Sequence, residues 1–330
     1  MKEITAYFNI IKRFSSWYKI KIFALINYFV DIHYKIRHLK ETNFKLGMQH
    51  LYKNNLNDAI LRFQLIDKFF APNDQQTNYW LGWTYFLKNN YAKSLFHLQK
   101  SSEADQIKLA SFLQNHDDLL EIPPQIWQEY RNIIAEYFTN YSFGINKMPL
   151  PYTFVTKAIS NITKLPNNYN ILELGSNIGL IGHEIKKRFP SNFILIGVEN
   201  SERMNDLAKK YYVNNNIYDQ MLGVSIPSFL QQNTSTFDVV LSCCSLSFTK
   251  NLLSYFNLIY STINQLGYFI FCLPINKVTI FSLKRKEFVY SIEDIKEALG
   301  QTRFTILDID QLNSTKNDRY CIIFCKKGNE

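Results

Sequence analysis

The most informative segment for the fold is ILELGSNIG, residues 171–179. Its first four residues predict a short buried strand, and residues 180–189 predict a helix, with a glycine-bearing turn between them. Because Gly175 has no Cβ, a ligand can approach the backbone closely at this turn. The start of the helix also presents N–H groups that have no partner inside the helix. The segment is therefore expected to hold a ligand at the carboxyl end of a strand, where such sheets bind their ligands.

Strands and helices alternate from this segment to the end of the chain. The predicted strands are 171–174, 193–199, 237–243, 268–273, 304–309 and 320–325, and the predicted helices are 180–189, 202–212, 252–266 and 291–299. Such alternation indicates a parallel sheet with helices on both faces. Ser291 is the expected N-cap of the last helix, with Asp294 at its third helical position. The last two strands have no helix between them, so we expect an antiparallel hairpin.

An acidic residue follows the second strand, which ends in Gly197-Val198-Glu199. Glu199 lies 24 residues beyond Gly175, and its carboxylate can accept hydrogen bonds from both hydroxyls of a ribose. A glycine turn followed by an acid at the end of the next strand predicts an adenosine-containing cofactor. A plain α/β domain with a tight turn is the alternative.

Two segments in the N-terminal half repeat each other. Gly47 precedes Ala59 by 12 residues, Gly82 precedes Ser94 by the same spacing, and the two glycines lie 35 residues apart. This period resembles the tetratricopeptide (TPR) repeat, a helix–turn–helix unit of about 34 residues. A glycine lets the next helix approach closely, with a small residue opposite. Residues 41–122 are therefore predicted to form a TPR-like helical domain; an ordinary pair of helical hairpins is the alternative.

The positive charge is concentrated at the start of the chain. Residues 1–40 carry eight lysines and arginines against two acids, so most of the net charge of +9 lies there. We expect a basic amphipathic helical arm that covers the next domain, with peripheral contact to an anionic membrane as the alternative. Because this charge is remote from the predicted site, nucleic acid is not an expected partner. Paired prolines at 123–124 begin the second domain, 123–330.

The cysteines and the apolar N-terminal stretch bear on location. All five cysteines lie in strand-like runs of the C-terminal half, and none has metal-ligand spacing with a histidine. We therefore expect free thiols in a reducing compartment and no metal site. Cys243 and Cys244 would point in opposite directions if both lay in a strand. The stretch 22–30 is too short to span a bilayer and no signal cleavage site follows it, so a cytoplasmic protein is expected.

The chain resembles class I S-adenosylmethionine-dependent methyltransferases preceded by TPR repeats. Segment 196–204, IGVENSERM, is similar to the second-strand signature of that family, and 217–221 and 237–241 are similar to its third and fourth strands. The resemblance implies a Rossmann-like sheet of seven strands with an antiparallel last hairpin, S-adenosyl-L-methionine as cofactor, and methyl transfer to a small molecule or protein. The residues that it places at the cofactor are Glu173, Gly175, Ser176, Asn177, Gly179, Glu199, Asn200, Met204, Ser225, Cys243 and Tyr141.

Three positions depart from the family pattern. Asn177 stands where the turn normally has glycine, and Asn is the residue that best replaces glycine at positive φ. Ser225 and Cys244 stand where the family has acids after its third and fourth strands. With two polar anchors replaced, a catalytically inactive interaction protein with the methyltransferase fold is an alternative. An NAD-dependent oxidoreductase is a second alternative, because Gly179 and Gly182 retain part of a dinucleotide motif; the closing hairpin counts against it.

No side chain stands out as a catalytic base. Methyl transfer is an in-line displacement in which positioning supplies much of the rate. His183 lies in the helix after the turn, where packing or solvent contact is the simpler role. Tyr290 is the better candidate to face the substrate, although a single tyrosine usually packs. Phe138 and Tyr141 resemble the aromatic segment that folds over the cofactor in such enzymes. The sequence assigns no catalytic residue.

Overall fold

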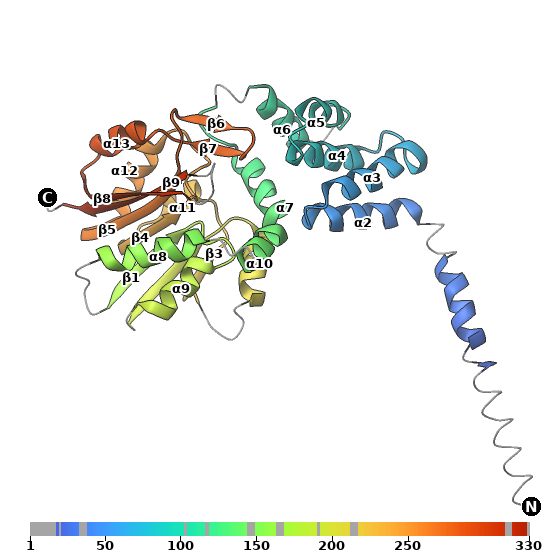
Figure 1. Ribbon diagram of the computed structural model, residues 1–330, viewed down its shortest axis with the longest axis horizontal. Helices are drawn as coiled ribbons and strands as arrows, with labels where there is room; N and C mark the ends of the chain where they lie inside the picture. Colours follow the sequence, from blue (N-terminus) through green and yellow to red (C-terminus); the bar gives the residue numbers. More distant parts are fainter. Residues whose placement is uncertain are drawn as a thin grey trace, which may run out of the picture.

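The computed structural model describes residues 18–19, 21–32, 38–101, 104–115, 119–143, 149–162, 168–189, 192–211, 217–313 and 319–328. Figure 1 shows a helical N-terminal half beside an α/β C-terminal half. Helix α7, Pro124–Phe143, lies between the two. The fold therefore has a helical part and an α/β part.

The C-terminal half is built on a sheet of seven strands. These are β1 Tyr169–Leu174, β2 Phe193–Val198, β3 Gln220–Leu222, β4 Phe237–Cys243, β5 Ile263–Pro274, β8 Phe304–Asn313 and β9 Arg319–Lys327. Their order is β3-β2-β1-β4-β5-β9-β8. The first five run parallel, whereas β9 is antiparallel to both β5 and β8. The expected mostly parallel sheet with an antiparallel final hairpin is confirmed, and strand order reverses between β1 and β4.

Helices cover both faces of this sheet because its strands are apolar on both sides. Adjacent residues of β1 show the pattern: Ile171 belongs to one core cluster and Leu172 to the other. On the Ile171 face, helices α8 Pro149–Asn161 and α9 Leu180–Arg188 contribute to the core. The Leu172 face is covered by helices α11 Ile226–Gln232, α12 Leu252–Thr262 and α13 Ile292–Gly300. Helix α10, Glu202–Tyr211, packs against α7.

Two local features differ from the predicted elements, one at the end of α12 and one after β5. The helix predicted over 252–266 ends at Thr262, and the following residues begin β5. A register shift in the β4–β5 pairing accommodates them, with Leu266 at a φ of 66°. A second difference is a short hairpin of β6, Ile280–Ser282, and β7, Glu287–Val289, which sequence periodicity did not reveal. The N-cap role of Ser291 is confirmed, since its side chain accepts a hydrogen bond from the Asp294 amide.

The N-terminal half consists of successive helical hairpins. Its helices are α2 Leu39–Tyr52, α3 Leu56–Leu65, α4 Gln75–Leu87, α5 Tyr91–Leu98 and α6 Ala104–Gln114, with a π-helical segment, Ile66–Phe70, after α3. A Cβ on Gly47 would lie 2.6 Å from the Phe63 ring, and one on Gly82 would lie 2.5 Å from Leu98 Cγ. Equivalent glycines therefore permit close packing in the two hairpins. Their assignment as TPR repeats stays a prediction.

The helical half holds the β6–β7 hairpin of the other half. The Tyr91 hydroxyl donates to the Leu283 carbonyl at 2.8 Å, and Lys286 Nζ donates to Asn89 Oδ1 at 2.7 Å. The rings of Phe112 and Phe281 meet edge to face, with centroids 5.1 Å apart. The hairpin is thus fixed to helices distant in the sequence.

The basic arm is described only in part, at residues 18–19, 21–32 and 38–40. Residues 21–32 form a helix whose large apolar side chains are exposed, for example Phe23 and Phe29. Within the described part of the chain, no helix has the length and apolar character needed to cross a membrane.

Candidate functional site

A cavity of about 420 Å³ opens at the carboxyl ends of the central strands. Its lining includes residues that follow β1, β2 and β4 and residues of helix α7. Residues 285 and 287 at the β6–β7 hairpin complete its wall. Because strand order reverses between β1 and β4, this is the position where open α/β sheets bind their ligands.

The glycine turn after β1 has the expected conformation. Gly175 has a φ of 74°, and a Cβ there would lie 2.1 Å from Ser245 Oγ. The Ser245 hydroxyl instead donates to the Gly175 carbonyl at 3.2 Å. Asn177 has a φ of 52°, and its side-chain amide donates to the same carbonyl at 2.7 Å. Asn177 therefore keeps the left-handed turn and ties it with its own side chain.

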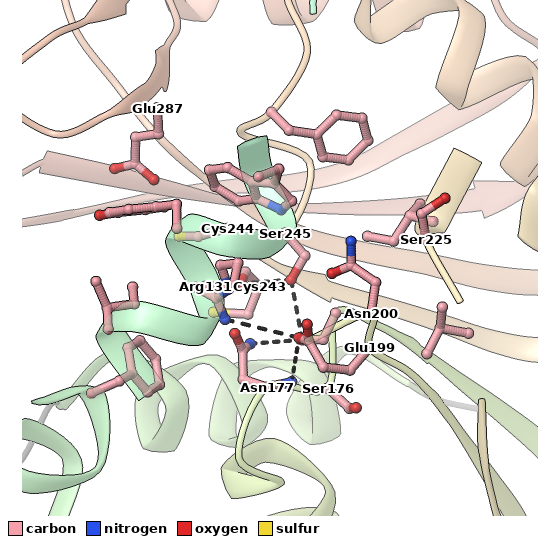
Figure 2. Close-up of a pocket in the computed structure, with 18 of the residues that line it drawn as sticks. Arg131, Ser176, Asn177, Glu199, Asn200, Ser225, Cys243, Cys244, Ser245 and Glu287 are labelled. Atoms are coloured by element: carbon pink, nitrogen blue, oxygen red, sulfur yellow. Dashed lines mark hydrogen bonds and ion pairs between the residues drawn. The ribbon is translucent and has the colours of Figure 1, made fainter. Parts of the chain in front are cut away.

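Glu199 joins this turn to the end of β2. Its side chain is 4% exposed and accepts hydrogen bonds from the backbone amides of Asn177, at 3.1 Å, and Ser201, at 2.9 Å. Arg131 of α7 places a guanidinium nitrogen 3.9 Å from the same carboxylate. An ionised carboxylate has about four lone-pair positions, so it can still accept from a ligand in the cavity. Figure 2 shows Arg131 and Asn177 beside Glu199.

Glu173 is a second buried carboxylate in this cavity. One of its oxygens accepts a hydrogen bond from the Tyr218 hydroxyl at 2.8 Å, and the other has no hydrogen-bond partner among the described residues. Burial raises the pKa of Glu173 to about 8, and the charge of Glu199 acts in the same direction. The hydrogen bond from Tyr218 opposes the rise in pKa. A cationic ligand group would supply the partner that the second oxygen lacks.

The far end of the cavity carries an ion pair that sequence reasoning missed. Arg285 Nε lies 2.6 Å from Glu287 Oε1, and Arg285 Nη2 donates to the Tyr320 hydroxyl at 2.9 Å. Burial raises the pKa of Glu287 to about 7, although Arg285 opposes the rise. In the sequence these residues look like a solvated charged loop, since the hairpin that turns them inward has no clear periodicity.

Eight of the predicted residues line this cavity: Glu173, Gly175, Ser176, Asn177, Glu199, Asn200, Ser225 and Cys243. In Figure 2, Ser225 lies on one side of Glu199. Cys244 and Glu287 lie on the other side. The cavity thus has two ends, and the predicted residues occupy the Glu199 end and the middle.

Other candidate residues lie elsewhere. Gly179 caps α9 with a φ of 81° and does not line the cavity. Met204 is fully buried in a small core cluster with Ala135 and Ile178, so it supports the site only through packing. The side chain of Tyr141 lies outside the described residues.

Neither residue considered for a catalytic role reaches the cavity. Tyr290, the better candidate to face the substrate, packs in the core, as a single tyrosine usually does. Its ring is buried, and its hydroxyl shares its one proton between the carbonyls of Leu246 and Thr249. His183 lies half-buried on α9, away from the cavity lining.

Cys243 and Cys244 do not point in opposite directions. Strand β4 ends at Cys243, and Cys244 adopts a left-handed conformation with a φ of 57°. Both side chains consequently line the cavity. All five cysteines are free thiols, as expected. Hydrogen bonds from the thiols of Cys244 and Cys272 lower the pKa of Cys243. The hydrogen bond with Cys243 raises the pKa of Cys244, and burial raises the pKa of Cys272.

The comparisons with known proteins returned solved structures of low sequence identity. No family model and no curated protein matches the sequence. Similar solved structures include magnesium protoporphyrin IX methyltransferase of Synechocystis PCC 6803 with bound S-adenosylmethionine (13% identity, TM-score 0.48, 62% of this chain and 96% of that chain). A S-adenosylmethionine-dependent methyltransferase of Leishmania major has 13% identity and a TM-score of 0.49, covering 66% of this chain and 91% of that one. At such identities the reaction has to be argued from this chain's own site.

Proposed function

We propose that this chain is a class I S-adenosylmethionine-binding protein. The observation that supports this most directly is the joining of the glycine turn and Glu199 in one cavity, through the hydrogen bond from the Asn177 amide. The sheet order, with β9 inserted antiparallel between β5 and β8, agrees with that class. It departs from the order 3-2-1-4-5-6 of dinucleotide-binding sheets, which weighs against the oxidoreductase alternative.

More particularly, we propose a methyltransferase with an unidentified acceptor. The residues present fit the cofactor: Glu199 would accept from the ribose hydroxyls, and the unpartnered oxygen of buried Glu173 would accept from the amino group of the methionine part. Ser225 and the apolar residues after it, Ile226 and Pro227, would enclose the adenine. Bound there, the cofactor supplies an electrophilic methyl group on a sulfonium.

The opposite end of the cavity is the proposed acceptor site. Trp127, Tyr130 and Phe248 give it apolar walls, which exclude water and orient a bound acceptor. Glu287 has a pKa near neutrality and faces this end, so it can take a proton from an acceptor amine or hydroxyl. Arg285 holds the Glu287 carboxylate in place through their ion pair.

For the helical half, residues 41–122, we propose a role in covering the acceptor site. Its contacts to the hairpin through Tyr91 and Asn89 support this, since that hairpin carries Arg285 and Glu287. As a TPR-like domain it would also offer a surface to a protein partner. Residues 1–40 would act as a separate arm against this domain or a membrane surface. Free cysteines fit a cytoplasmic location.

Calorimetric titration with S-adenosylhomocysteine tests the cofactor assignment. We expect binding to the wild type and at least a tenfold loss of affinity in Glu199→Gln, because each charge-assisted hydrogen bond contributes about 1.5–3 kcal/mol. Glu202→Gln, an exposed neighbour on α10, is the matched control and should bind normally. Binding of NADH without S-adenosylhomocysteine would overturn the proposal.

Transfer of a labelled methyl group in a cell extract tests catalysis separately. We expect label on an acceptor with the wild type and a loss of label with Glu287→Gln. Cofactor binding without any transfer would identify the chain as the inactive alternative. Equal transfer by Glu287→Gln would remove Glu287 from the mechanism.

A further inference from the structure

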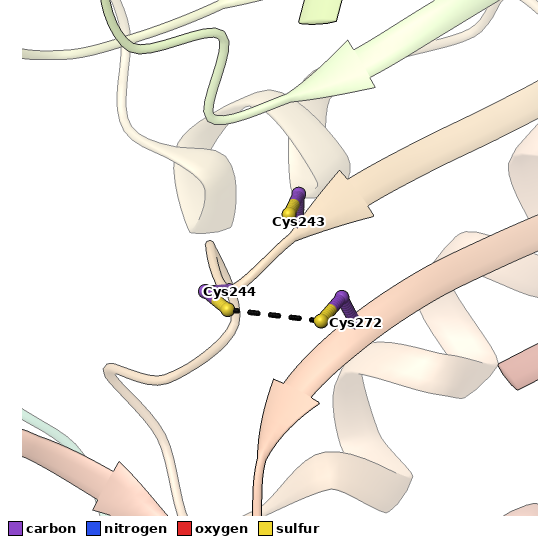
Figure 3. Close-up of side chains that lie close together, drawn as sticks. All are labelled: Cys243, Cys244 and Cys272. Atoms are coloured by element: carbon purple, nitrogen blue, oxygen red, sulfur yellow. Dashed lines mark hydrogen bonds between the residues drawn. The ribbon is translucent and has the colours of Figure 1, made fainter. Parts of the chain in front are cut away.

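Three thiols meet at the end of β4. The sulfur atoms of Cys243, Cys244 and Cys272 all lie within 4.8 Å of one another, and those of Cys244 and Cys272 are 3.9 Å apart. In Figure 3, Cys243 lies at the end of β4, Cys244 in the loop that follows it, and Cys272 on the neighbouring strand β5. The sequence predicted no metal site, because spacing alone does not reveal ligands that come together through strand pairing.

The backbone brings the thiols together by two devices. Cys243 and Cys272 are directly paired across the parallel strands β4 and β5. Cys244 then leaves the strand in a left-handed conformation, and its amide donates to the Cys272 carbonyl at 2.9 Å. That conformation costs about 1–2 kcal/mol for a residue with a Cβ. In return, the Cys244 sulfur lies beside the other two, where an extended residue would point away.

We propose that this cluster, Cys243–Cys244–Cys272, is a three-thiolate site for Zn²⁺. Three sulfurs bound to one zinc ion at about 2.3 Å lie roughly 3.8–4.0 Å apart. The 3.9 Å separation already matches that distance, and the remaining separations need at most small rotations of the side chains. Thiolates are soft ligands that select zinc over the hard cations calcium and magnesium.

The site has an entrance and a fourth ligand position. Cys272 is fully buried, whereas Cys243 and Cys244 are half-buried and line the cavity. An ion can therefore enter through the cavity, and a zinc ion held by three thiolates keeps one position for water or a ligand from that side. Arg285 belongs to the same wall, so its positive charge offsets part of the negative charge of the thiolates.

Metal titration of the reduced full-length chain tests the site without any cofactor. We expect one equivalent of Zn²⁺ to be retained against a chromophoric chelator, and Co²⁺ to give thiolate-to-metal charge-transfer absorption. Cys243→Ser and Cys272→Ser should each weaken binding by at least about 10–100-fold, since even second-shell changes have that effect on metal sites. Cys325→Ser, a buried cysteine on β9 outside the cluster, is the control and should bind like the wild type.

The outcomes separate this site from the proposed cofactor function. Failure of the reduced wild type to bind Zn²⁺, or equal binding by Cys243→Ser and Cys272→Ser, would overturn the site. So would a Cys244–Cys272 disulfide, found by peptide mapping, that persists in the zinc-loaded protein. Circular dichroism of each variant establishes that it is folded. Zinc binding by a chain that does not bind S-adenosylhomocysteine would leave the metal site standing and refute the cofactor assignment alone.

Discussion

Replacing Glu173 by glutamine should stabilise the protein in a pH-dependent way. Burial raises the pKa of Glu173 from 4.5 to about 8. The folded state therefore holds its proton more tightly than the unfolded state. Between these two values the free energy of unfolding falls as the pH rises, by about 1.4 kcal/mol per pH unit. Glutamine keeps an acceptor for the Tyr218 hydroxyl and removes the ionisation.

The size of the effect follows from how far the solution pH lies above the unfolded-state pKa of 4.5. At pH 5 the pH-dependent stabilities of the variant and the wild type should differ by less than about 1 kcal/mol, because this pH lies only half a unit above that pKa. At pH 7 the wild type has lost about 3 kcal/mol relative to pH 4.5, and the variant has not. Above pH 8 the difference levels off, since Glu173 is then ionised in both states.

Urea unfolding at pH 5, 6, 7 and 8 measures this difference. The quantity to compare is the difference in free energy of unfolding between the variant and the wild type, followed as the pH changes. Any packing effect of the amide is the same at each pH and does not affect this trend. Glu297→Gln, on an exposed position of α13, is the control and should show no such gain. A gain that is constant from pH 5 to pH 8 would refute the assignment of a raised pKa. The same variant should lose affinity for S-adenosylhomocysteine if Glu173 binds its amino group.

Three further substitutions test packing and contacts away from the cofactor. Gly82→Ala places a Cβ 2.5 Å from Leu98 Cγ and should lower the free energy of unfolding by about 1–3 kcal/mol, as overpacking does. The control Gly300→Ala meets nothing within 4 Å and should not lower it. Similar melting curves for the two variants would contradict the close packing of the hairpins. Tyr290→Phe removes the hydrogen bonds to two buried carbonyls and should lower the free energy of unfolding by about 1–3 kcal/mol. Cofactor affinity should not change. Weakened binding in calorimetry would show that Tyr290 belongs to the site. Tyr91→Phe loses its hydrogen bond to the β6–β7 hairpin, so hydrogen exchange in that hairpin should become faster. The free energy of unfolding should fall by about 0.5–1.5 kcal/mol. Unchanged exchange would show that this contact does not hold the hairpin.

Features that depend on local chemistry could be predicted from the sequence. The segment around Gly175 predicted a strand, a left-handed turn and a helix because only glycine and asparagine adopt such a turn easily. Alternating strands and helices predicted the parallel sheet, and Ser291 predicted the start of α13. Glu199 was predicted to meet the turn because carboxyl ends of neighbouring parallel strands lie at one edge of a sheet.

Which other side chains share that edge depends on tertiary packing. The Cys243–Cys244–Cys272 cluster depends on the pairing of β4 with β5 and on a left-handed residue that no alternation pattern marks. Arg285 and Glu287 face the cavity because the helical half fixes their hairpin through contacts nearly 200 residues away in the sequence. Packing sets the direction of these side chains and their long-range contacts. It brings together residues whose spacing along the chain does not indicate that they are close in space.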